Sequence, residues 1–242
     1  MARMCRNKFR AACERPLGLQ MGHAALLCKM VAGLVLCMCW WWEAQAAEPA
    51  AQWRASTLQA RLQQAQTQPD VAEALYDMGR KVATVCVHCH GHRSDQTFFE
   101  VPYLDGQNPA YLIEQMRQFS QGIRKNAFME GILKALSVDE VVGMALFYAQ
   151  QPLPARAPKE VALLAKGQAH YARICVACHG ADGHGNAQHP RLAGQHAGYV
   201  ELTLQRYRAG SSTRSNPTMG MVAQSMSDQD IQAVAAYLVT LP

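Results

Sequence analysis

The pentapeptide CVHCH at residues 86–90 returns as CVACH at residues 175–179, 89 positions further along the chain. Each copy holds two cysteines separated by two residues, and a histidine directly follows the second cysteine. Two cysteines at this spacing suit a redox-active dithiol, half of a zinc site or a covalent anchor for a prosthetic group. The rest of the sequence has to distinguish these three chemistries.

The two halves of the chain are similar well beyond the pentapeptides. YLDGQNPAYL at residues 103–112 aligns with RLAGQHAGYV at residues 191–200, and the offset between matched positions stays between 88 and 90. The matched pairs include Pro102 and Pro190, Gly106 and Gly194, Gln107 and Gln195, Tyr111 and Tyr199, Arg124 and Arg214, Asn126 and Asn216, and Met129 and Met219. Two copies of so long a period indicate a duplicated domain rather than a long repeat array.

Proline-rich sequence joins the two halves. QPLPARAPKE at residues 151–160 contains three prolines, and this composition is typical of a stiff linker. We predict a first domain at residues 69–150, a linker at 151–160 and a second domain at 161–242. Residues 47–68, which are rich in Gln and Ala, precede the first domain as an N-terminal extension or linker, and a short helix, a linker or an arm are all open there.

Helical patterns dominate both halves. No segment shows sustained alternation of apolar and polar residues, whereas the segments before each pentapeptide and at the end of each half have the apolar spacing of helices. Ser137 with Glu140, and Ser227 with Asp230, predict N-terminal caps for the two closing helices. An all-α domain of about 85 residues with this much loop would be marginally stable alone. We therefore expect a large apolar group at its centre.

The N-terminus has the features of an export signal. Basic residues precede an apolar run at residues 30–42, and Ala-Gln-Ala at residues 44–46 matches a cleavage site between small residues. We predict that residues 1–46 are a signal peptide and that the mature protein is periplasmic. An uncleaved apolar run would instead hold the protein at the membrane surface, and this alternative stays open.

Removal of the signal would change both the charge and the cysteine content of the chain. Residues 1–46 hold six basic and two acidic residues, which leaves 17 basic and 16 acidic residues in the remainder. A nearly neutral chain without a basic patch argues against nucleic acid as a partner. Every cysteine that remains belongs to one of the two pentapeptides.

These cysteines fit the covalent attachment of haem better than the other two chemistries. A structural zinc ion needs four ligands, of which one pentapeptide supplies at most three. A thioredoxin-like dithiol needs a βαβ context, which the helical pattern does not provide. In haem c, two thiols add to the vinyl groups and the histidine binds the iron, all from one helical turn. We predict two covalently bound haem c groups, attached through Cys86, Cys89, Cys175 and Cys178, with His90 and His179 as axial iron ligands.

Each iron needs a sixth ligand, and one methionine recurs at a matched place in each half. Met129 lies 39 residues after His90, Met219 lies 40 residues after His179, and each stands eight positions before a cap serine. We predict that both bind iron from a loop facing the haem, as soft thioethers that favour Fe(II). The methionines expected to be core residues instead are Met116, Met144, Met221 and Met226.

Six other histidines and two arginines are further candidates for iron ligands or haem contacts. None of the remaining histidines recurs in a distal position of both halves, which argues against a second histidine ligand. Those expected on the surface or in loops are His88, His92, His170, His184, His189 and His196. Arg124 and Arg214 do recur, and they would either pair with haem propionates or carry solvated charges.

The second half carries a resemblance to a known family. CVACHGADGHG, HPRLAGQ and RAGSSTRSNPTM resemble the dihaem cytochrome c4 family of class I c-type cytochromes, and the similarity covers about residues 70–242. The resemblance implies two tandem domains, each wrapped around one haem, with a backbone acceptor at Pro102 and Pro190 for the ligand histidines. The first half departs from the pattern, because GHRSDQTFFEVPYLDGQ after the first pentapeptide lacks the Gly-Ala-Asp-Gly-x-Gly run.

The family resemblance also implies a function. We expect an electron carrier, not an enzyme, that takes electrons from a quinol-oxidising complex and delivers them to a terminal oxidase. The alternative is the electron-accepting cytochrome subunit of a dehydrogenase, such as flavocytochrome sulfide dehydrogenase, which has a similar two-domain plan. A dihaem peroxidase would need an exchangeable position at the iron, and the two matched methionines argue against it.

Overall fold

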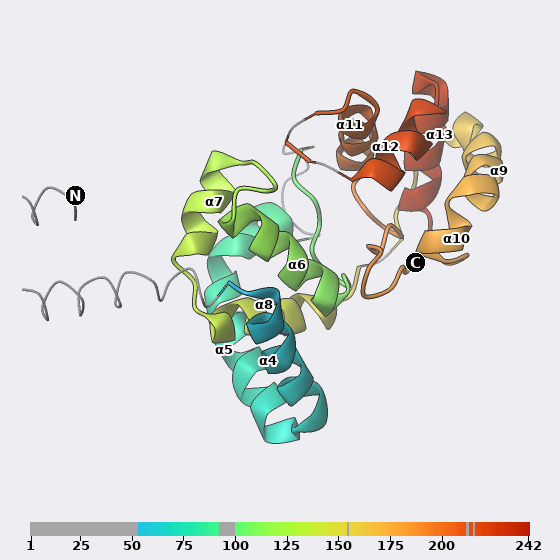
Figure 1. Ribbon diagram of the computed structural model, residues 1–242. Coiled ribbons are helices and arrows are strands. Elements are labelled where there is room, and N and C mark those ends of the chain that lie inside the picture. Colours follow the sequence, from blue (N-terminus) through green and yellow to red (C-terminus); the bar gives the residue numbers. More distant parts are fainter. Residues whose placement is uncertain (1–52, 92–99, 154, 212, 215) are drawn as a thin grey trace, which may run out of the picture. The chain divides into compact units, whose positions relative to one another are not determined.

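The computed structural model of the protein describes residues 53–91, 100–153, 155–211, 213–214 and 216–242. These residues form helices joined by turns and loops, and no strand is assigned among them (Figure 1). The first half holds α4 (Ala55–Thr67), α5 (Pro69–His90), α6 (Pro109–Ser120), α7 (Ala127–Lys134) and α8 (Val138–Ala149). The second half holds the short 3₁₀ helix η1 (Val161–Leu163), α9 (Leu164–Ile174), α10 (Val176–His179), α11 (Ala197–Arg208), α12 (Pro217–Gln224) and α13 (Asp228–Val239).

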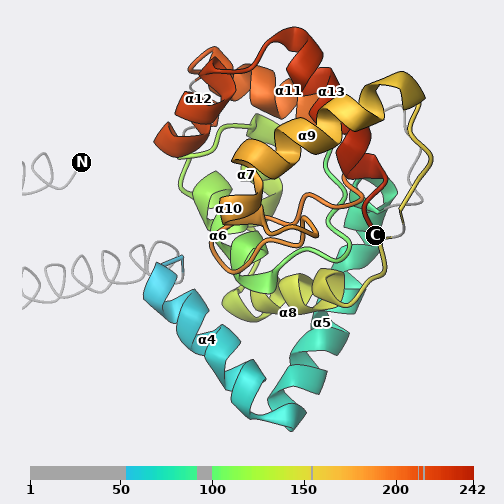
Figure 2. The same cartoon turned by 90° about the vertical axis from the view of Figure 1, so that its right-hand side faces the viewer.

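Each half has its own hydrophobic core. In the first half the core gathers between α5, α6 and α8, with Leu75, Val141 and Tyr148 almost fully buried. In the second half it gathers between α9, α11 and α13, with Tyr171 and Ile231 almost fully buried, and Ile231 is the repeat counterpart of Val141. The helices α5 to α8 and α9 to α13 therefore follow the same order around the two cores, as the sequence repeat predicts (Figures 1 and 2).

In each half, the helix that leads into the pentapeptide crosses the closing helix at a glycine. A Cβ atom on Gly79 of α5 would lie 2.0 Å from backbone atoms of Gly143 in α8. A Cβ atom on Gly167 of α9 would lie 2.0 Å from the carbonyl oxygen of Ala233 in α13. Because real Cβ contacts are far longer than this, only glycine lets the two helix backbones approach so closely.

We expect Gly167→Ala to destabilise the second half, because its methyl group has no space between α9 and α13. Overpacking of this kind costs about 1–3 kcal/mol of unfolding free energy. Gly131→Ala is the matched control, since a Cβ there meets nothing within 4 Å and alanine favours the helix by about 0.5–1 kcal/mol. Chemical denaturation followed by circular dichroism measures both effects. Equal denaturation midpoints for Gly167→Ala and the unsubstituted protein would contradict the close crossing.

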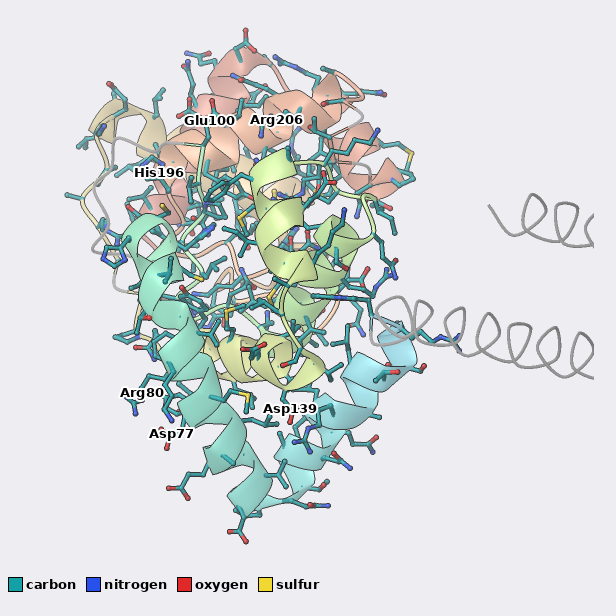
Figure 3. All side chains as sticks on the ribbon, turned by 90° about the vertical axis from the view of Figure 1, so that its left-hand side faces the viewer. Asp77, Arg80, Glu100, Asp139, His196 and Arg206 are labelled. Carbon is teal, nitrogen blue, oxygen red and sulfur yellow. The ribbon has the colours of Figure 1, made fainter. Side chains whose placement is uncertain are left out.

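The N-terminal helix α4 belongs to the first core. Leu58 and Leu62 on one face of α4 are buried with Trp53, which precedes the helix. Arg61 donates two hydrogen bonds to the carboxylate of Asp139 on α8, at 2.7 and 2.9 Å (Asp139 is labelled in Figure 3). The part of the predicted extension that the structure describes is therefore a helix docked on the first half.

The closing helices begin where the sequence predicts. Ser137 and Ser227 each accept a hydrogen bond from the backbone N–H three residues on, and the acid at that position accepts one in return. Both capping boxes are confirmed. They set the start of α8 and α13, and so the faces that these helices turn toward the two cores.

None of the helices that the structure describes combines the length and the apolarity needed to cross a membrane. The predicted signal peptide at residues 1–46, with its apolar run at 30–42, lies outside the described residues.

Candidate haem sites

The first pentapeptide ends helix α5. Cys86 and Cys89 are both half-buried and are free thiols, and Cys86 packs against the first core. Burial raises the pKa of the Cys86 thiol. The pKa of a redox-active cysteine is instead usually lowered by nearby positive charge, so this site does not have the electrostatics of a catalytic dithiol.

The second pentapeptide has similar surroundings, but its helix is interrupted where that of the first pentapeptide is continuous. Helix α9 ends at Ile174, and the separate turn α10 carries the rest of the motif. Cys175 and Cys178 are again half-buried free thiols, and Cys175 packs against the second core. Burial raises the pKa of Cys175 to about 11, which again argues against a reactive thiolate.

The two histidines of the pentapeptides are held in the same way. The Nδ1 atom of His90 lies 2.9 Å from the carbonyl oxygen of Pro102, and that of His179 lies 2.9 Å from the carbonyl oxygen of Pro190. Because a carbonyl oxygen only accepts, each Nδ1 carries the proton and Nε2 keeps its lone pair. Burial lowers the pKa of both histidines, which favours the neutral form that binds metals. The backbone acceptors that the family resemblance implies are present.

Met129 and Met219 occupy matched positions, but in short helices and not in loops. The side chains of Asn126 and Asn216 cap α7 and α12 and accept a hydrogen bond of 3.0 Å from the backbone N–H of the methionine. The prediction of a loop was wrong, because a helix of eight residues is too short to show a clear apolar period. Each methionine side chain packs against the core of its own half.

The donor set in each half fits haem c. Two half-buried thiols, a neutral imidazole with a free Nε2 and a core-facing thioether are the groups needed for covalent attachment and for two axial bonds. In the first half the hydroxyl of Tyr148 is buried without a hydrogen-bond partner among the described residues, and burial raises its pKa, with a smaller contribution from the Cys86 thiol. Such an unpaired group is expected where a prosthetic group supplies part of the surroundings.

Four matched side chains meet between the halves. Arg214 donates hydrogen bonds of 2.6 Å to the hydroxyls of both Tyr199 and Tyr111, and Arg124 donates one of 3.1 Å to Tyr199. Burial alone would raise the pKa of Tyr199, but the two guanidinium groups lower it to about 7. Both arginines are half-buried and bound to tyrosine hydroxyls, and their pairing with haem propionates stays a prediction. The sequence repeat pairs Tyr111 with Tyr199, but it does not predict that both bind the same arginine.

The histidine expectations need one correction. His170 is only 7% exposed and lies between Arg173 and Asp230, so it is a core residue of the second half and not a surface residue. His88 is exposed as expected, whereas His92 lies outside the described residues.

Comparison with known proteins places the chain in a family. The Cytochrome c family model matches residues 164–242. A cytochrome c4 of Thiocapsa roseopersicina is 37% identical over 173 residues, which cover 65% of this chain and 88% of the relative. The chain belongs to the cytochrome c4 family. Membership confirms the resemblance seen in the sequence, together with an all-α fold of two tandem class I cytochrome c domains.

Two further similarities extend the comparison. The crystal structure of reduced recombinant cytochrome c4 from Pseudomonas stutzeri superposes on this chain with a TM-score of 0.62 at 29% identity. The match covers 69% of this chain and 98% of the crystallised chain. A thiosulfate dehydrogenase electron acceptor of Stutzerimonas stutzeri is 33% identical over 204 residues, which cover 78% of this chain and 94% of the relative. The chain is thus a dihaem electron carrier with two covalently bound haem c groups, and not an enzyme.

Proposed function

We propose that this chain is a periplasmic cytochrome that carries electrons from a quinol-oxidising complex to a terminal oxidase. One observation carries the proposal: the same set of side chains recurs at two separate cores. Each set has a cysteine pair, a histidine held through Nδ1, and a methionine in the first turn of an asparagine-capped helix. Haem supplies one-electron chemistry between Fe(III) and Fe(II) when bound. Periplasmic location is supported by the basic and apolar sequence of residues 1–46 and its small-x-small site.

The proposed roles of the side chains follow from this arrangement. Cysteine attachment keeps each group in place without relying on affinity, and burial in an apolar core limits solvent access. The histidine is oriented through its Nδ1–H bond, and the methionine donates a soft thioether that raises the reduction potential. The side chains proposed for attachment are Cys86, Cys89, Cys175 and Cys178, and those proposed as axial ligands are His90, Met129, His179 and Met219.

One observation favours a second candidate, an electron acceptor for a dehydrogenase. The match to the thiosulfate dehydrogenase electron acceptor covers 78% of this chain, or about 189 of its 242 residues. The span from Pro69 to Pro242 holds only 174 residues, so this match must include residues before Pro69. The match to the cytochrome c4 of Thiocapsa roseopersicina covers 65% of the chain and does not require them. Part of the N-terminal segment, where α4 lies, is therefore shared with that electron acceptor.

We expect the oxidised holoprotein to be reduced by membranes that contain a quinol-oxidising complex when quinol is supplied, and then reoxidised by a terminal oxidase. Stopped-flow absorbance of the haem bands measures both rates, and the same experiment is run with a thiosulfate dehydrogenase and thiosulfate. Reduction that depends on thiosulfate, with none from the quinol-fed membranes, would establish the second candidate in place of the first.

A further inference from the structure

One buried glutamine in each half reaches into the other half. Gln107 and Gln195 are 6% and 5% exposed, and each follows a glycine with positive φ, Gly106 at 68° and Gly194 at 70°. In both turns the glutamine N–H donates to the carbonyl of the leucine three residues before it, which is a type II arrangement with glycine at its third position. The two turns therefore project matched side chains across the boundary between the halves.

Each glutamine binds one backbone segment of the opposite half through two hydrogen bonds. Gln195 accepts from the N–H of Tyr103 at 2.8 Å and donates to the carbonyl of Tyr103 at 2.9 Å. Gln107 accepts from the N–H of Arg191 at 2.7 Å and donates to the carbonyl of Arg191 at 2.9 Å. The two contacts are related by the sequence repeat, because Tyr103 and Arg191 are matched positions.

The peptide groups that the glutamines bind are the same ones that hold the ligand histidines. The N–H of Tyr103 and the carbonyl of Pro102 form one peptide bond, and that carbonyl accepts from Nδ1 of His90. The N–H of Arg191 and the carbonyl of Pro190 likewise form one peptide bond, and that carbonyl accepts from Nδ1 of His179. A chain of two hydrogen bonds thus joins each histidine to a glutamine of the other half.

Such a chain of hydrogen bonds transmits polarisation from the glutamine to the histidine. A peptide bond is delocalised, so an acceptor on its N–H increases the negative charge on its carbonyl oxygen. That oxygen then accepts more strongly from the histidine Nδ1–H, which makes Nε2 a stronger donor to a metal. A stronger donor stabilises Fe(III) relative to Fe(II) and lowers the reduction potential.

We propose that Gln107 and Gln195 are positioning residues that tune the potential of the haem in the opposite half. This inference rests on the proposed function, because it takes His90 and His179 as iron ligands. Gln195 lowers the potential of the first haem through Tyr103 and Pro102, and Gln107 lowers that of the second through Arg191 and Pro190. The contact between the halves and the potentials of the two haems are therefore linked by the same atoms.

The test is a crossed pattern of potentials in the holoprotein. Gln195→Leu removes the acceptor from the peptide that binds His90, so the potential of the first haem should rise while that of the second stays. The expected change is a roughly two- to tenfold increase in the equilibrium constant for reduction, the range that one ordinary hydrogen bond contributes. Gln107→Leu should produce the reverse pattern. Redox titration followed by absorbance measures both potentials, and Met129→His and Met219→His identify which potential belongs to which haem.

A second measurement separates tuning from simple loosening of the contact between halves. In the reduced protein, the Nδ1–H proton resonance of His90 should move upfield in Gln195→Leu, and that of His179 should not. Gln195→Met, which keeps the length of the side chain, should give the same shifts if the leucine variant folds poorly. Asn108→Ala is the matched control, since it removes a 3.0 Å bond to the carbonyl of His184 across the same boundary without touching either peptide.

Three outcomes would overturn the proposal. A glutamine variant could shift the reduction potential of the haem in its own half, could shift both potentials equally, or could shift neither potential. If neither moves while the methionine variants change the potentials, the iron ligands stand and the cross-half tuning fails. If the methionine variants also leave both potentials unchanged, the assignment of the iron ligands fails as well.

Discussion

The double variant Cys175→Ala/Cys178→Ala is expected to carry one covalent haem where the unsubstituted protein carries two. Both thiols are half-buried, and Cys175 packs against the second core. Without the two thioether bonds the haem is held only by its axial ligands, so it is lost on denaturation. Because the haem would supply much of the apolar core of a small domain with much loop, the second half should also lose most of its stability.

Intact mass, haem staining after denaturing electrophoresis and circular dichroism measure this loss. Cys86→Ala/Cys89→Ala is the matched variant in the first half and should remove the other haem. The first half should lose less helical signal, because α4 adds Trp53, Leu58 and Leu62 to its core. Two covalent haems on the variant without Cys175 and Cys178 would show that the pentapeptides are not the attachment sites.

Met219→His is expected to lower the potential of one haem substantially and to leave the other almost unchanged. The side chain of Met219 packs against the second core from the first turn of α12, and the bond from its backbone N–H to Asn216 fixes that turn. Imidazole is a better donor to Fe(III) than a thioether, so the oxidised state gains stability. The absorption band of the methionine–Fe(III) bond should lose about half of its intensity, since one of two such bonds is gone.

Met221 is the natural control for this experiment. It lies two residues beyond Met219 on the same helix and has no methionine counterpart in the first half, where Gly131 stands. It is 66% exposed, so the expectation that it is a core residue was wrong. Met221→Leu should leave both potentials and the band unchanged. Loss of the band in Met221→Leu, together with its survival in Met219→Leu, would show that the ligand assignment is wrong by two residues.

The N-terminal segment shows where sequence patterns were harder to interpret. The Gln- and Ala-rich composition of residues 47–68 leaves a short helix, a linker or an arm open, and the structure has the helix. Leu58, Leu62 and Ala65 stand on one face of α4 and are buried, a helical spacing that the surrounding Gln residues obscure. The ion pair between Arg61 and Asp139 joins positions 78 residues apart, and no local pattern predicts such a partner.

The sequence by itself determined the chemistry of this protein. Attachment of haem needs two thiols and a histidine within one helical turn, and a pentapeptide contains all three, so local order is sufficient. The repeat then predicts Met129 and Met219 as the further iron ligands, because duplication keeps the distance from each histidine nearly constant. The capping boxes at Ser137 and Ser227 were equally local, and the structure has both.

Only the tertiary structure decided what lies between the two halves. The repeat marked Gln107 and Gln195 as equivalent, yet nothing in either segment shows that each binds a backbone peptide 84 or 92 residues away. The same is true of Arg214, which contacts Tyr111 across a separation of 103 residues. Such contacts depend on how two separately built cores dock, and docking is set by the shape and polarity of whole surfaces. Periodicity and motif spacing describe one segment at a time, so they contain no information about that arrangement.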